Sequence, residues 1–186
     1  LKYSIARINL KTASDSLAFV NKLRTTYEAD PNNETVFSLL CDMYNGLNKT
    51  DELSQLVDKK IASDPNNFVA LATKARLLLD KEGKSQKPNY DECIDLYKRA
   101  IQANPKSSMA YTFLGFAINS KAQLINNNPN EQKSLYRESA GYLEKAQDLD
   151  PERAQANWAY PLYQCYYALY GMDDSRTKDI QKLIQK

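Results

Sequence analysis

Four of the five prolines that follow Asp or Asn in this chain of 186 residues end a unit with an apolar pattern of helical spacing, and the fifth, Pro129, lies in the turn NNNPN. The four prolines are Pro31, Pro65, Pro105 and Pro151, and successive ones stand 34, 40 and 46 residues apart. Proline has no backbone N–H and disfavours helical geometry in the residue before it, so each of these dipeptides ends a helix. A helix-and-stop unit that returns at this spacing indicates an array of helical repeats.

The stretch between two stops contains two amphipathic helices. In residues 34–64 the first apolar stripe has the spacing i, i+3, i+4, i+7 and consists of Phe37, Leu40, Cys41 and Tyr44. The turn GLNKT separates it from a second stripe, which consists of Leu53, Leu56, Val57 and Ile61. Two short helices joined by a short loop form an antiparallel hairpin. The sequence therefore predicts an all-α chain of stacked helix hairpins, without a sheet.

The stops divide the chain into five units, at about 1–33, 34–67, 68–107, 108–151 and 152–186. We expect these units to form one domain over residues 1–186. In the first unit, Leu1–Leu10 is predicted as the remnant of an earlier helix. In the last unit a helix is predicted from about Glu152 to Tyr170, and Pro161 in its interior should kink it.

Composition argues against several classes of function. Lys and Arg number 25 and Asp and Glu 23, so a net charge of only +2 argues against a protein dedicated to nucleic acid or a membrane surface. No apolar run approaches the roughly 18 residues that a transmembrane segment requires. The chain has no histidine, the commonest catalytic base and metal ligand. We therefore predict no enzyme activity, no catalytic residues, no cofactor and no bound metal.

The three cysteines, Cys41, Cys93 and Cys165, are widely separated and odd in number, and the sequence has no C-x-x-C pair. This pattern does not fit a disulfide framework or a zinc ribbon. We predict three reduced thiols that are buried as small apolar side chains.

The spacing within the units resembles that of the tetratricopeptide repeat (TPR), in which aromatic-x-x-Leu-Gly-x-x-Tyr is followed by Ala-x-x-x-Phe and then Pro. The second unit matches the first half with Phe37, Leu40, Cys41 and Tyr44, and the fourth with Tyr111, Leu114, Gly115 and Ile118. The resemblance covers residues 12–151 well and the last 35 residues loosely. It implies hairpins stacked into a right-handed superhelix that binds a protein or peptide on the concave face lined by the first helix of each hairpin.

Small residues are expected where the two helices of one hairpin cross closely. The repeat phase places three such residues on the first helices: Cys41, Ala75 and Gly115. The positions that face them on the second helices are Leu53, Cys93 and Ser139. This assignment accounts for two of the three cysteines without a redox role.

The same resemblance makes six residues candidates for contact with a partner: Asp42, Asn45, Arg76, Phe116, Asn119 and Trp158. Two of them have an alternative interpretation. Trp158 could instead be a core residue beside Pro161, and Arg76 could be solvated or paired within the chain.

The sequence thus predicts a non-catalytic scaffold for protein–protein interaction. The alternative is an assembly module of a cell-envelope complex, which contacts a ligand or glycan through its aromatic residues. The segment NWAYPLYQCYYALYG at 157–171 is similar to the C-terminal helix of exported repeat proteins from Gram-negative gut bacteria. That similarity implies a periplasmic or cell-envelope location, whereas the unpaired cysteines favour the cytoplasm.

Overall fold

The structure of the chain is a computed structural model that describes residues 13–185, and all regular secondary structure in that range is helical. The helices are α2 (Ala13–Ala29), α3 (Glu34–Gly46), α4 (Thr50–Ser63), α5 (Phe68–Glu82), α6 (Asp91–Ala103), α7 (Ser108–Gln123), α8 (Pro129–Leu149), α9 (Ala159–Tyr170) and α10 (Ser175–Ile184). This confirms the all-α fold class. The helix remnant predicted at residues 1–10 lies outside the described residues.

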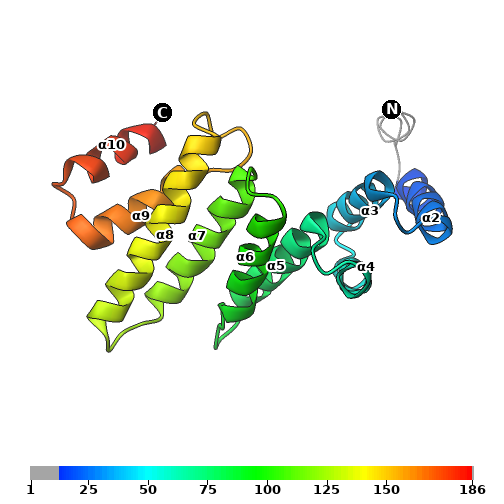
Figure 1. Ribbon diagram of the computed structural model, residues 1–186, viewed down its shortest axis with the longest axis horizontal. Coiled ribbons are helices and arrows are strands. Elements are labelled where there is room, and N and C mark those ends of the chain that lie inside the picture. The colour runs from blue at the N-terminus through cyan, green and yellow to red at the C-terminus, as the bar shows by residue number, and fades with distance from the viewer. Residues whose placement is uncertain (1–12, 186) are drawn as a thin grey trace. The chain divides into compact units, whose positions relative to one another are not determined.

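The helices follow one another as hairpins, and α7 and α8 lie side by side along most of their length (Figure 1). The first helices of the hairpins are α3, α5, α7 and α9, and their returning helices are α4, α6, α8 and α10. The chain divides into two compact units, which end and begin at Ser63 and Asp64. Unit 1 contains α2–α4 and unit 2 contains α5–α10. That all residues form one domain remains a prediction.

The first three proline stops form the same kind of turn. Each one ends a helix and also provides the cap that starts the next helix. Asn33, Asn67 and Ser107 follow the prolines by two residues, and each side chain accepts a hydrogen bond from the backbone N–H three residues later, at 3.1, 3.0 and 3.2 Å. Such caps satisfy N–H groups that have no partner within the helix. The tetrapeptides DPNN, DPNN and NPKS therefore end one helix and begin another with their own atoms.

Two of these turns are also bound by a cation from the returning helix of the next hairpin. Lys60 is buried and its ammonium donates to the carbonyl of Pro31 at 3.1 Å, while it pairs with Glu34 at 2.6 Å. In unit 2 the guanidinium of Arg99 donates to the carbonyl of Pro65 at 2.8 Å. A carbonyl left at the end of a turn thus receives a charge-assisted hydrogen bond.

The fourth stop differs, and it corrects the predicted start of the last hairpin. Arg153 stands where the other turns have a capping Asn or Ser, and its φ of 60° is not helical. Helix α9 consequently begins at Ala159 rather than near Glu152. Pro161 then lies in the first helical turn, where no backbone N–H is needed, so it does not interrupt the interior of the helix as predicted.

The segment 151–158 is a loop that its own side chains hold in place. The carboxylate of Asp150 accepts hydrogen bonds from the backbone N–H groups of Ala154 and Gln155, at 2.9 and 2.7 Å. The indole Nε1 of Trp158 donates to the backbone carbonyl of Asp150 at 2.7 Å. Arg153 donates to the carbonyl of Leu183 at 2.7 Å and so links the loop to the end of α10.

This loop should make the protein sensitive to acid. Hydrogen bonds from the backbone N–H groups of Gln155 and Ala154 lower the pKa of Asp150 below its usual value, although burial opposes this. A lowered folded-state pKa adds stability above the unfolded-state pKa of about 3.9, and that stability is lost as the pH falls through the folded-state pKa. We expect Asp150→Asn to be less stable than the parent at pH 7, with the difference shrinking below about pH 4. Urea unfolding of both proteins between neutral and acid pH measures this; a constant difference would contradict it.

The α7–α8 crossing confirms the predicted need for small residues. A Cβ on Gly115 would lie 2.5 Å from Cγ of Leu143, which is much closer than van der Waals contact. The hydroxyl of Ser139 donates to the carbonyl of Gly115 at 2.7 Å, so the two facing positions are in direct contact. Ala75 and Cys93, the corresponding pair in the α5–α6 hairpin, are both buried.

All three cysteines are free and buried, as predicted. Burial raises the pKa of Cys41 to about 12 and the pKa of Cys93 and Cys165 to about 11. The thiols are therefore protonated near neutral pH and are poor nucleophiles. Within residues 13–185, no helix has the length and apolar character needed to cross a membrane.

Candidate functional site

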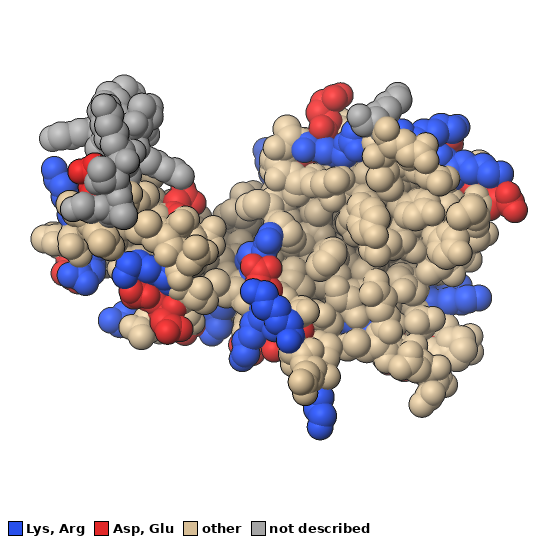
Figure 2. Space-filling model, turned by 180° about the vertical axis from the view of Figure 1, so that it is seen from behind, with Lys and Arg blue, Asp and Glu red and all other residues tan. Residues whose placement is uncertain are grey.

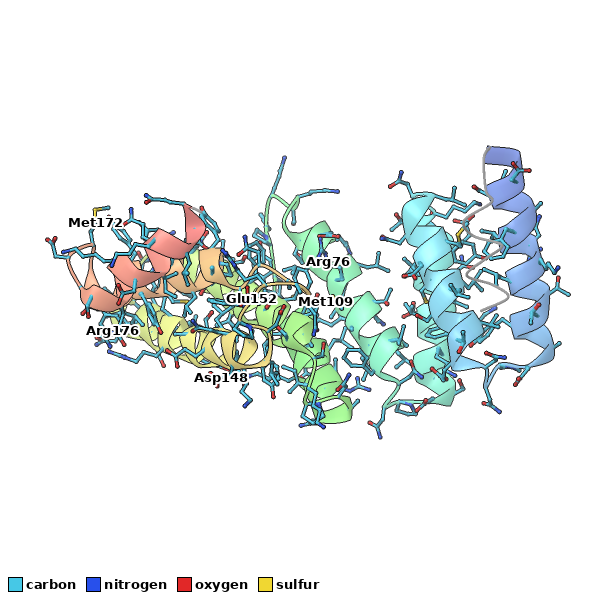
Figure 3. All side chains as sticks on the ribbon, turned by 90° about the horizontal axis from the view of Figure 1, so that it is seen from above. Arg76, Met109, Asp148, Glu152, Met172 and Arg176 are labelled. Atoms are coloured by element: carbon cyan, nitrogen blue, oxygen red, sulfur yellow. The ribbon has the colours of Figure 1, made fainter. Side chains whose placement is uncertain are left out.

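The first helices of unit 2 line two adjoining open hollows, and the loop before α9 lines one of them. The larger has a volume of about 530 Å³, and its lining includes Arg76, Met109, Phe116, Asn157 and Tyr160. The smaller, of about 350 Å³, shares Arg76 and Phe116 with it and adds Asp80 and Lys84. We call the two hollows together the first-helix groove. Figure 3 shows Arg76 on α5 and Met109 on α7 close together in the view from above.

Three large apolar side chains are exposed in this groove. Met109 is 39% exposed, Phe116 41% and Tyr160 51%, and all three line the larger hollow. Figure 2 shows a broad area of unit 2 without Lys, Arg, Asp or Glu, and these charged residues gather at its edges. Exposed apolar side chains that converge on one hollow mark an interaction site more often than scattered single ones do.

Arg76 is paired within the chain, which was the alternative interpretation of this residue. Its Nε donates to both carboxylate oxygens of Asp80, at 3.0 and 3.1 Å, one helical turn along α5. Its guanidinium carbon lies 4.4 Å from the centre of the Phe113 ring. The side chain is about half exposed, so a partner in the groove can still touch it.

One wall of the larger hollow comes from the loop 151–158, through Gln155, Ala156 and Asn157. The wall is fixed because Asp150 and Trp158 hold the loop from within by the hydrogen bonds described above. Side-chain amides at such a rim can bond to the backbone of an extended peptide, since each amide carries both donors and an acceptor.

Two predicted contact residues belong to the core, and this corrects their assignment. Trp158 and Asn119 are each only 1% exposed, so neither is available to a partner. The side-chain amide of Asn119 donates to the carbonyl of Pro161 at 2.9 Å and accepts from the thiol of Cys165 at 2.9 Å. Both residues therefore position α9 and the loop before it. The alternative interpretation of Trp158 as a core residue is the correct one.

Asp42 and Asn45 are exposed on α3 of unit 1. Arg76 and Phe116 are exposed in unit 2 and line both hollows. Of the six predicted residues, the structure thus brings these last two together. A binding role for Asp42 and Asn45 remains a prediction.

Sequence reasoning missed Tyr160 and the loop residues that complete the groove. A signal for them was present, because Arg153 replaces the cap found after the first three prolines and a proline is common in a first helical turn. Both observations predict a later helix start, which would have assigned residues 151–158 to a loop.

The lining of the groove offers apolar surface, side-chain amides, Arg76 paired with Asp80, and Lys84. In the part of the chain that the structure describes, no three His, Cys, Asp or Glu residues are arranged to hold a metal ion.

These features define a helical-repeat protein with a TPR-like fold, and comparison with solved structures agrees. A crystal structure of MamA matches with a TM-score of 0.67 and 16% identity over 92% of this chain and 90% of that chain. MamA from Desulfovibrio magneticus RS-1 matches with a TM-score of 0.66 and 17% identity over 98% and 93%. A thermophilic TPR protein of Thermus thermophilus matches with a TM-score of 0.63 and 10% identity over 92% and 83%. No protein-family model matches the sequence, and neither does any curated protein.

Proposed function

We propose that this chain is a non-catalytic scaffold that binds a peptide segment of a partner protein in the first-helix groove. The observation that carries the proposal is the convergence of Met109, Phe116 and Tyr160, all exposed, on a hollow of about 530 Å³. Ligand sites have volumes of about 300–1,000 Å³, so this hollow is of suitable size for part of a peptide. Asp42 and Asn45, exposed on α3 of unit 1, do not line this groove and are separate candidate contacts.

The groove combines features that support binding rather than catalysis. Aromatic residues and Met are enriched in the buried centres of protein interfaces. The side-chain amides of Gln155 and Asn157 can form hydrogen bonds with the backbone of the partner. The buried thiols have raised pKa values, so they do not supply a reactive nucleophile. The fold is also compatible with the proposal, because repeats of this kind create extended binding surfaces.

A second candidate function is contact with a small molecule or glycan within a cell-envelope assembly. It is favoured by α9, which contains five tyrosines and no charged residue. Tyr160, Tyr167 and Tyr170 are exposed on this helix. A thermal shift with neutral sugars or peptidoglycan fragments, in the absence of a stoichiometric protein partner, would favour this function over the first.

Phe116→Ala should weaken binding of a protein isolated by pull-down by about thirtyfold or more, since truncating an aromatic hot-spot residue costs about 2 kcal/mol or more. The melting temperature should change little, because Phe116 is exposed. Calorimetric titration of the purified pair and a melting curve measure the two effects.

The matched control is Met172→Ala, which removes an exposed apolar side chain outside the lining of the groove. It should bind like the parent. If Phe116→Ala also binds like the parent, the groove is not the binding site. If it melts many degrees lower, Phe116 is a core residue.

A further inference from the structure

We infer that the first-helix groove selects an uncharged peptide segment that inserts a bulky apolar side chain, and that Arg76 serves as a packed wall and not as a clamp for an acidic group. This inference rests on the proposed function and specifies the chemistry of the partner.

The charge of the larger hollow is balanced within the chain. Among the described residues that line it, Arg76 is the only charged one, and Asp80 binds its Nε through both oxygens. The guanidinium also lies against the ring of Phe113, 4.4 Å from its centre. A partner carboxylate would meet a guanidinium whose charge Asp80 already offsets, and it would lose part of its own hydration on entering the hollow.

The apolar lining of the larger hollow fits a partner with an apolar side chain. We call this lining, which consists of Met109, Phe116, Tyr160 and Pro161, the apolar seat. Met109, Phe116 and Tyr160 present exposed apolar surface to the same hollow, and Pro161 adds another apolar lining residue. Methionine adapts its shape to different side chains, and aromatic rings prefer offset or edge contacts with other rings. An aromatic, leucine or methionine side chain therefore fits this seat.

The main alternative is an acidic partner that binds at the smaller hollow, because Lys84 is part of its lining. An acidic partner residue could be attracted there, but Lys84 is absent from the lining of the larger hollow that holds the apolar seat. The two chemistries predict different peptides and different salt dependence, so one experiment distinguishes them.

The test is selection of a displayed library of random linear peptides on the whole chain, with Phe116→Ala as the counter-target. We expect the enriched peptides to contain Trp, Phe, Leu or Met and to have no consistent acidic residue. The synthetic form of the best peptide should lose about thirtyfold or more in affinity on Phe116→Ala. Its affinity should change less than about threefold on Arg76→Met and between low and high salt, because no charge is shared with the peptide.

Arg176→Met is the matched control, because Arg176 is also paired, with Asp174, and lies 3.4 Å from the centre of the Tyr170 ring, outside the groove lining. Enrichment of acidic peptides that depend on both Phe116 and Arg76, with strong weakening by salt, would overturn this inference and leave the groove as the binding site. If no enriched peptide depends on Phe116, the proposed function fails, and this inference fails with it.

Discussion

Trp158→Ala is expected to lower the free energy of unfolding by about 3–5 kcal/mol, the usual cost of removing a large buried aromatic side chain. The indole is 1% exposed and belongs to the core cluster formed by α7–α10. Its Nε1 also donates to the carbonyl of Asp150 at 2.7 Å. Truncation therefore leaves a cavity and an unpaired carbonyl in the same place. Urea unfolding followed by circular dichroism measures the loss.

Trp158→Phe is the informative control for this prediction. It keeps most of the apolar volume but removes the indole N–H, so it should cost less, about 1–3 kcal/mol. The expected order of stability is parent, then Trp158→Phe, then Trp158→Ala. An unchanged midpoint for Trp158→Ala would show that the side chain is not part of the core.

Gly115→Ala should destabilise the protein by about 1–3 kcal/mol, despite the better helix propensity of alanine, because the added Cβ overpacks the α7–α8 crossing. That Cβ would meet Cγ and both Cδ atoms of Leu143 at 2.5–3.0 Å. Leu143 is fully buried, so it has little room to move away. Denaturant unfolding of the parent and the variant measures the effect.

Gly141→Ala provides a control of opposite sign on the neighbouring helix α8. A Cβ at Gly141 meets nothing within 4 Å, so the substitution should stabilise by about 0.5–1 kcal/mol through helix propensity alone. Leu143→Ala should cost less in the Gly115→Ala background than in the parent, since the two changes share one contact. Equal effects of Gly115→Ala and Gly141→Ala would contradict the close crossing.

Much of the fold could be predicted from the sequence, because its main signals are local. A proline ends a helix without help from distant residues, and an apolar stripe at helical spacing predicts the buried face. The need for a small residue at Gly115 also followed from the repeat phase, and the distance to Leu143 confirms it. The repeat phase could not place the start of α9. In the other units a capping Asn or Ser marks the start of the helix, and here Arg153 stands at that position.

The candidate site was only partly predictable for a related reason. Repeat phase correctly placed Arg76 and Phe116 on the exposed faces of α5 and α7. It misplaced Asn119 because phase describes one helix at a time. Asn119 is in contact with α9, where the backbone carbonyl of Pro161 accepts a hydrogen bond from its side-chain amide. Tyr160 lines the larger hollow from the first turn of α9, whereas the phase had placed it in the interior of a longer helix.

The turn at Pro105 is held by local hydrogen bonds, and this has a consequence for how the chain can change length. The turn at 104–107 binds its own N–H groups and carbonyls, so it does not depend on how long the adjoining hairpin is. The hairpin after it has helices of 16 and 21 residues, whereas α3 and α4 have 13 and 14. Residues added at the tip of a hairpin, far from the turn, therefore extend its reach and leave the joint between hairpins unaltered. We therefore expect residues inserted at the tip of the α7–α8 hairpin, around residues 124–128, to leave the turn at Pro105 unaltered.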